Sequence, residues 1–202
     1  GKLLDYLKER NRFDNTLIFF ISDNGGADYT LATDNGEYKG GKITDFEGGI
    51  KVPMVMSWPA KVRYGVRFTP MVSSLDIYQT ILNSAGMEEP PVDLDGVNLL
   101  PSIQADQLVH DYLFFFFLYN HSIRSADYKL SWNTMTGDSL LYHIQTDPYE
   151  KLNIYGREAN DKVVELVRVY AEWEQKMISA RWPALINYKY EDKDKHVYWF
   201  EN

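Results

Sequence analysis

Residues 16–26 read TLIFFISDNGG, and the fold class can be argued from this run. Residues 16–21 are β-branched, aliphatic and aromatic with no polar alternation. This pattern is typical of a strand covered on both faces, as in the parallel sheet of an α/β protein. The strand ends at Ser22, and two glycines follow after two more polar residues. Open α/β sheets bind ligands at the carboxyl ends of their strands, so we expect a functional site here.

The next segments fit the same class. Residues 27–49 form a polar loop with several glycines, and a loop of this length inside a compact domain is usually functional. Residues 52–58 (VPMVMSW) predict a second short buried strand, which Pro59 ends.

Residues 70–86 begin with Pro and end with Gly, which predicts a helix between them. Ser73 or Ser74 is a suitable N-cap. We expect the apolar face of this helix to comprise Ile77, Ile81 and Leu82. Residues 93–101 (DLDGVNLLP) predict a turn followed by a short apolar segment.

After about residue 105 the pattern changes to short strands between turn signals, which predicts an antiparallel sheet. The expected strands are residues 112–119, 123–125, 128–132 and 140–143. The turns between them are expected at Asn120-His121, Ala126-Asp127 and residues 136–138. Residues 161–177 predict a helix that covers the sheet, with one apolar face. That face is expected to comprise Val163, Leu166, Val167, Tyr170, Trp173 and Met177. We therefore expect an α/β domain in residues 1–104 and an antiparallel sheet with a C-terminal helix in residues 105–202.

Composition excludes several classes of function. The 21 Lys and Arg against 29 Asp and Glu give a net charge of −8, with no basic cluster for a nucleic acid. The longest apolar run, residues 112–119, is too short to cross a bilayer, so we expect no membrane partner. Without cysteine, this chain holds no disulfide, thiolate metal site or cysteine nucleophile. It opens within an amphipathic segment without Met or leader, and we expect it to start inside a larger protein.

Asp23 and Asn24 are the first candidates for chemistry. A carboxylate and an amide carbonyl are hard oxygen ligands that suit Ca²⁺ or Mg²⁺. Lys42 is the second candidate, because paired glycines before it let the backbone approach a ligand closely and its ammonium group suits an anion. The alternatives from these residues alone are an ordinary Asp-Asn-Gly turn and a solvated loop lysine.

Taken together, the motifs resemble the sulfatase family over about residues 3–177. In order they are residues 22–26 (SDNGG), 40–42 (GGK), 47–49 (EGG), 52–53 (VP), 58–59 (WP), 74–82 (SLDIYQTIL), 94–101 (LDGVNLLP), 123–124 (IR) with 128–130 (YKL), and 141–142 (LY) with 147–150 (DPYE) and 152–153 (LN). The resemblance implies the C-terminal part of the alkaline-phosphatase-like sulfatase fold. It implies hydrolysis of aryl or carbohydrate sulfate esters, and a periplasmic, secreted or lysosomal location.

The resemblance also implies roles for individual residues. Asp23 and Asn24 would supply two ligands of a calcium ion, and Lys42 would contact the sulfate or the leaving oxygen. The nucleophile of the family is a formylglycine made within a Cys/Ser-x-Pro-x-Arg motif. The nearest string here, residues 57–61 (SWPAK), has Lys in place of Arg and matches the ordinary strand end of the family. We therefore expect the N-terminal part of the same enzyme as a partner, and no sulfatase activity from this chain alone.

Three further residues border the substrate region by resemblance. His121 and Arg124 could contact a sugar or an aryl group, and Asp28 could set specificity; an exposed turn histidine and solvated polar groups are the alternatives. Two other functions remain open. One is a phosphodiesterase or phosphonate hydrolase of the same superfamily, and the other is a non-catalytic carbohydrate-binding or interaction module.

Overall fold

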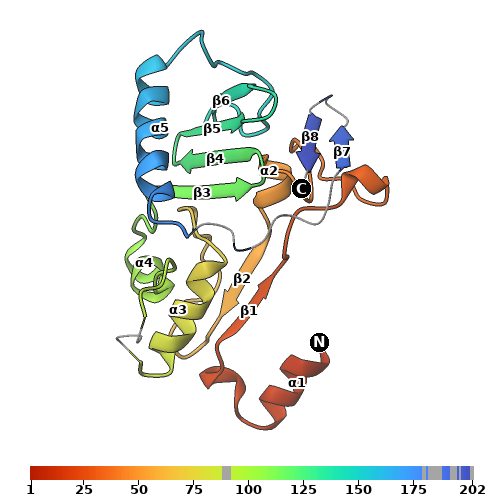
Figure 1. Ribbon diagram of the computed structural model, residues 1–202. Coiled ribbons are helices and arrows are strands. Elements are labelled where there is room, and N and C mark those ends of the chain that lie inside the picture. Colours follow the sequence, from red (N-terminus) through yellow and green to blue (C-terminus); the bar gives the residue numbers. More distant parts are fainter. Residues whose placement is uncertain (88–91, 179–180, 182–187, 192–194, 196, 201–202) are drawn as a thin grey trace. The chain divides into compact units, whose positions relative to one another are not determined.

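The computed structural model describes every residue except 88–91, 179–180, 182–187, 192–194, 196 and 201–202 (Figure 1). It divides into two compact units, residues 1–22 with 53–111 and residues 23–52 with 112–202. The loop between the first two strands therefore groups with the C-terminal sheet. The division into 1–104 and 105–202 follows chain order and stays a prediction for the domains of the whole protein.

The first unit contains the first two strands of the chain and four helical segments. These elements are α1 (Lys2–Glu9), η1 (Phe13–Asn15), β1 (Ile18–Ile21), β2 (Met54–Ser57), α3 (Leu75–Ser84) and α4 (Leu99–Ala105). No helix in the described part of the chain combines the length and the apolar character that a membrane span requires.

The two strands of the first unit pair antiparallel, with Ile18 opposite Ser57 and Ile21 opposite Met54. The prediction of a parallel sheet is wrong for this pair, because an unbroken apolar run indicates a strand but not its direction. Phe20 and Val55 face each other across the pair and are 73% and 58% exposed. The described residues therefore leave one face of these strands open, whereas the sequence predicts cover on both.

Helix α3 starts directly after its N-cap Ser74, as predicted, but it buries a polar face. Its buried residues are Asp76 and Thr80, while Ile81 is 46% exposed. The Asp76 carboxylate accepts hydrogen bonds from the backbone N–H groups of Ser73 (2.7 Å) and Val97 (2.9 Å). The predicted face is therefore wrong for Ile81, while Ile77 and Leu82 are half-buried, and the fully buried side of α3 supplies acceptors to neighbouring backbone.

The short segment predicted after residue 93 contains helix α4. The Asn98 side chain caps this helix by accepting a hydrogen bond from the Leu100 N–H at 3.1 Å. The Leu99 N–H donates to the Thr80 hydroxyl at 3.0 Å, so both buried polar residues of α3 bind this segment.

The second unit is built on a four-stranded antiparallel sheet in the order β3-β4-β5-β6. The strands are β3 (Tyr112–Phe117), β4 (Asn120–Ser125), β5 (Tyr128–Asn133) and β6 (Ser139–His143). The predicted turn at Asn120-His121 is wrong, because both residues lie in β4. The chain turns instead at Leu118, whose φ of +55° is left-handed. A separate hairpin pairs β7 (Tyr188–Glu191) with β8 (Val197–Phe200).

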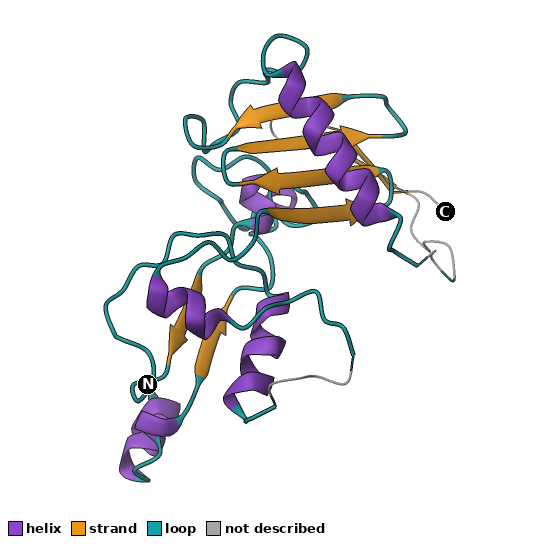
Figure 2. Ribbon diagram, turned by 90° about the vertical axis from the view of Figure 1, so that its left-hand side faces the viewer, coloured by secondary structure: helices purple, strands orange, loops and turns teal. Residues whose placement is uncertain are grey.

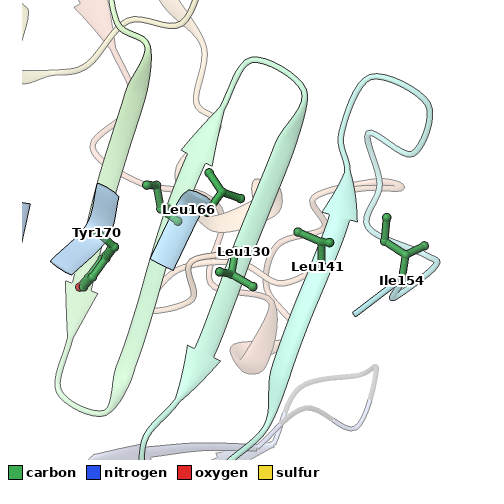
Figure 3. Close-up of a cluster of buried hydrophobic side chains, with 6 residues drawn as sticks. Leu130, Leu141, Ile154, Leu166 and Tyr170 are labelled. Atoms are coloured by element: carbon green, nitrogen blue, oxygen red, sulfur yellow. The ribbon is translucent and has the colours of Figure 1, made fainter. Parts of the chain in front are cut away.

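Helix α5 (Asn160–Glu174) lies across one face of the sheet, as predicted (Figure 2). Side chains of a strand alternate between the two faces, and one set meets this helix. The core residues on this face are Ile123, Leu130, Leu141, Ile154, Leu166 and Tyr170 (Figure 3). Val167 and Met177 are 47% and 42% exposed, so these two predicted face residues do not belong to the core.

The opposite face of the sheet is covered by the loop that ends in helix α2 (Glu47–Ile50). Phe46 packs there on Tyr142 and Ile144 in a second cluster. The sheet is therefore buried on both sides, by α5 on one and by the loop on the other.

Leu166→Ala tests this arrangement. Leu166 is completely buried, so its truncation leaves a cavity and is expected to lower the free energy of unfolding by about 2–5 kcal/mol. Val167→Ala, one position along the same helix, is expected to cost less than about 1 kcal/mol, because Val167 is largely exposed. Urea denaturation measures both. Equal losses in the two variants would contradict the assigned face of α5.

Candidate active site

Asp23 and Asn24 come directly after β1, in the second unit. Asp23 is exposed, and its Oδ1 accepts a hydrogen bond from the Asn24 N–H at 3.0 Å. Gly25 then approaches another segment closely: its N–H donates to the Gly49 carbonyl at 2.8 Å. A Cβ at Gly25 would lie 1.7 Å from the Gly48 carbonyl oxygen, so only glycine permits this contact.

The backbone brings Lys42 to the same segment. The Lys42 N–H donates to the Gly26 carbonyl at 3.0 Å. The Asn35 side chain joins both parts of the loop, because its Nδ2 donates to the carbonyls of Gly26 and Gly40, each at 3.0 Å. Lys42 thus lies beside the residues that follow Asp23 and Asn24, and its side chain is exposed.

The two lysines of the Lys39–Lys42 stretch have different surroundings. The Lys39 ammonium donates to the Tyr142 hydroxyl at 3.0 Å and lies over the Phe46 ring, 4.8 Å from its centroid. It is therefore held against the sheet. Because Lys42 is exposed, it is the lysine of this stretch that can contact a ligand.

The structure adds a buried charge cluster that the sequence analysis did not identify. Lys129 on β5 is completely buried, with its ammonium 2.8 Å from Glu150 Oε1 and 3.4 Å from Glu47 Oε1. Glu47 also meets Arg124 Nε at 3.3 Å, and its backbone N–H donates to Glu150 Oε2 at 2.7 Å. We call Glu47, Arg124, Lys129 and Glu150 the charge cluster. It joins the loop to the sheet.

The two carboxylates of the charge cluster respond differently to their surroundings. Burial alone would raise the pKa of Glu47, but the positive charges of Lys129, Arg124 and Lys51 outweigh it and hold that pKa below its ordinary value. Burial raises the pKa of Glu150, and Lys129 offsets only part of this effect. The surrounding cations therefore favour the charged form more strongly at Glu47 than at Glu150.

A signal for the charge cluster was present in the sequence. Glu47, Lys129 and Glu150 each stand in a motif of the resemblance. Period-2 alternation in β5 also puts Lys129 on the face opposite Leu130, so a cation there needs a partner from another segment. Which segment supplies that partner follows only from the tertiary structure.

His121 lies in the core under α5, not at an exposed turn. It is 8% exposed, its ring stacks on Trp132 at 5.2 Å, and its Nδ1 lies 3.1 Å from the Tyr170 hydroxyl. Burial lowers the pKa of His121, and the charges of Glu174 and Asp45 oppose this shift only in part. These contacts account for His121 without a substrate.

Of the other two candidates, Arg124 belongs to the charge cluster, with only 12% of its side chain exposed. Asp28 starts η2 (Asp28–Thr30), and its Oδ1 would lie 2.6 Å from a Cβ built on Gly41. Asp28 is therefore the one of these candidates that lies close to the residue before Lys42.

The Asp23-Asn24 pair could supply part of the coordination shell of a metal ion. Asp23 and Asn24 offer hard oxygen atoms, but the described residues contain no group of three or more His, Cys, Asp or Glu side chains suited to a metal. The donor chemistry fits Ca²⁺, and these two side chains supply part of the roughly six to eight oxygen ligands that this ion takes.

Comparisons with known proteins identify the family of this chain. Residues 41–181 match the family model described as N-sulphoglucosamine sulphohydrolase, C-terminal. Human N-acetylgalactosamine-6-sulfatase is 37% identical over 121 residues, which are 57% of this chain and 23% of that protein. An uncharacterized sulfatase, YdeN, of Escherichia coli strain K12 is 38% identical over 104 residues, or 51% and 18% of the two chains. The chain thus spans about a fifth to a quarter of the length of these curated relatives.

Solved structures share the fold. One, of a protein in complex with its substrate D-glucosamine-2-N,6-O-disulfate, matches with a TM-score of 0.74 and 25% identity over 87% of this chain and 37% of that one. A phosphonate monoester hydrolase from Silicibacter pomeroyi matches with a TM-score of 0.64 and 21% identity, over 87% and 37% of the two chains.

The buried state of His121 predicts a pH-dependent stability. Its folded pKa lies below the ordinary value of 6.5, so the unfolded chain binds the proton more tightly. This contribution is present above pH 6.5 and is lost as the pH falls from there through the folded pKa. His121→Phe keeps an aromatic ring in place and removes the titration.

The measurement is urea denaturation at pH 7 and at about pH 5.5. The fall in the free energy of unfolding between the two pH values is expected to be smaller in His121→Phe than in the unmodified chain. The loss of the contact with Tyr170 lowers the free energy of unfolding of His121→Phe equally at both pH values, so it cancels when the falls between the two pH values are compared. Identical falls in both proteins would contradict the buried, neutral state of His121.

Proposed function

We propose that this chain, which belongs to the sulfatase family, forms the C-terminal portion of an enzyme that hydrolyses sulfate esters. The observation that carries the proposal is the backbone contact between Lys42 and Gly26, since it joins the segment of an exposed lysine to the residues that follow the Asp23-Asn24 pair. A cation next to two hard oxygen ligands suits an anionic ester held by a metal ion.

Asp23 and Asn24 would hold Ca²⁺, with Mg²⁺ as the alternative. When bound, the ion supplies Lewis-acid polarisation of the ester oxygens. Asp23 suits this role because its side chain is exposed and its Oδ1 accepts a hydrogen bond from the N–H of the neighbouring Asn24.

Lys42 would stabilise the negative charge that develops on the sulfate or the leaving oxygen as the S–O bond breaks. A lysine ammonium in a preorganised loop does this without reorganising at the moment of reaction. The close backbone contacts of Gly25, Gly41 and Gly48 supply the preorganisation. Lys42 therefore acts by position and charge, and it transfers no covalent group.

The nucleophile is expected from the N-terminal part of the enzyme. Ser57 of the Ser-x-Pro-x-Lys string is the last residue of β2 and pairs with Ile18, and Trp58 after it is buried. A residue in such a strand end has a structural role, which supports the interpretation of the string as coincidence.

A sulfated sugar is the substrate class that we propose. The structural neighbour with the highest similarity given above has a disulfated glucosamine as its substrate. Lys42 would contact the sulfate group and Asp28 a polar group of the sugar, whereas the core position of His121 and the ion pair of Arg124 favour structural roles. A phosphonate or phosphate ester is the second candidate, because a phosphonate monoester hydrolase shares the fold.

Three substitutions in the full-length enzyme that contains this chain test the proposal. Lys42→Ala is expected to lower kcat on an aryl sulfate by about 100- to 1000-fold, the usual effect of removing one preorganised charge-stabilising group. Asp23→Ala is expected to weaken Ca²⁺ binding by about tenfold or more, measured by titration calorimetry. Lys176→Ala, an exposed lysine after α5, is the matched control and should leave both unchanged.

The 202-residue chain alone is expected to hydrolyse no aryl sulfate above background. Rates on sulfate, phosphate and phosphonate esters of the same alcohol distinguish the two enzyme classes. An unchanged calcium affinity in Asp23→Ala together with an unchanged rate in Lys42→Ala would favour the non-catalytic binding module instead.

A further inference from the structure

The charge cluster lies outside the chemistry proposed above, yet it is among the most deeply buried parts of the second unit. Glu47, Lys129 and Glu150 are at most 3% exposed. Buried ion pairs contribute little net stability, because desolvation of the ions offsets their attraction, and apolar residues often replace them without loss. Stability alone is therefore a weak reason for charges here, and their effect on the geometry of the loop is the stronger one.

Glu47 is the residue through which the charge cluster binds the loop. Its backbone N–H donates to Glu150 Oε2 at 2.7 Å, and its carboxylate meets Lys129 at 3.4 Å and Arg124 at 3.3 Å. These contacts fix both the backbone and the side chain of Glu47. Each partner comes from the sheet or from the segment after β6, so Glu47 can shift only if these contacts break.

The position of Glu47 is passed on to the candidate site through backbone contacts. The Gly48 N–H donates to the Lys39 carbonyl at 2.8 Å, and Gly49 accepts from the Gly25 N–H at 2.8 Å. A Cβ on Gly48 would lie 2.3 Å from the Gly40 carbonyl oxygen. These two segments of the loop are therefore in direct backbone contact, with no side chain between them. A shift of Glu47 would therefore move the residues that flank Asp23-Asn24 and Lys42.

We propose that Glu150, together with Lys129, is a positioning residue that fixes Glu47 and thereby holds Lys42 and the Asp23-Asn24 pair in place for hydrolysis. The inference rests on the proposed function of that site. Neither Glu150 nor Lys129 touches the substrate; both act through the loop.

The first test is Glu150→Gln in the full-length enzyme. The change keeps the shape of the side chain but removes the charge that meets Lys129. We expect kcat on an aryl sulfate to fall by about 10- to 100-fold, the scale of a small misplacement of a reacting group. KM should change by less than about threefold, since the loss is in the transition state. Glu165→Gln is the control, because Glu165 on α5 pairs with Lys162 at 2.6 Å and accepts a hydrogen bond from the Tyr112 hydroxyl at 2.9 Å, both away from the charge cluster.

A double-mutant cycle separates positioning from general destabilisation. Because Glu150 would act in part through Lys42, Glu150→Gln should lower kcat by a smaller factor once Lys42→Ala is present than it does in the unmodified enzyme. Independent effects that multiply would overturn the proposal. A second variant, Lys129→Met with Glu150→Leu, replaces the ion pair with apolar side chains and is expected to stay folded. It should lose kcat as Glu150→Gln does; full activity in this folded variant would also overturn the proposal.

Amide hydrogen exchange on the same proteins gives a readout that needs no turnover. In Glu150→Gln, exchange at Gly25, Lys42 and Gly48 should become at least about tenfold faster, while amides of β4 and β5 stay within about threefold. Uniform acceleration, or none, contradicts the anchoring. Absence of turnover in the unmodified enzyme contradicts the proposed function instead, and the exchange at these three amides still decides whether Glu150 fixes the loop.

Discussion

The arrangement of the second unit depends on one constraint: Lys129 is completely buried and has to keep a compensated charge. Removing an ammonium ion from water costs several kcal/mol, and the cost is offset only by close, well-placed carboxylates. Glu150 at 2.8 Å supplies the first of these and Glu47 at 3.4 Å the second. Because Glu47 belongs to the loop and Glu150 follows β6, compensation of this single cation ties three distant segments of the chain together. The apolar contact of Phe46 with Tyr142 then closes the same face of the sheet.

Short strands between turn signals predicted the C-terminal sheet, and helical periodicity predicted its covering helix. Leu130 lies between two polar neighbours along β5, and Leu166 and Tyr170 recur at helical spacing, so each pattern indicates the face that is buried. Periodicity failed where the buried face is polar. Asp76 and Thr80 are completely buried in α3 because they accept hydrogen bonds from backbone N–H groups. A hydrophobic pattern cannot predict where such acceptors are needed. The relative direction of β1 and β2 could not be predicted either, since an apolar run looks the same in a parallel and in an antiparallel pair.

The ordered motifs were a better guide to the candidate site than single residues. Asp23, Asn24 and Lys42 are chemically ordinary one by one, and the order of glycine pairs around them singled them out; the backbone contacts from Gly25 to Gly49 and from Lys42 to Gly26 now give that order a physical meaning. His121 shows the opposite case. A histidine beside an asparagine looks like a turn, but its ring meets Trp132 and Tyr170, residues 11 and 49 positions further along the chain. Neither contact leaves a local signature in the sequence.

The contacts that hold the loop to the sheet join residues far apart in the chain. Glu47 is separated from Lys129 by 82 positions and from Glu150 by 103. The β3–β6 strands follow one another through short turns, so they can pair early in folding, whereas closing a segment of this length costs chain entropy before any contact repays it. We therefore expect the sheet and α5 to assemble first, and the loop to dock last onto a Lys129 that stays hydrated until then. The candidate site would therefore be the last part of this unit to form and the first to open under denaturing conditions.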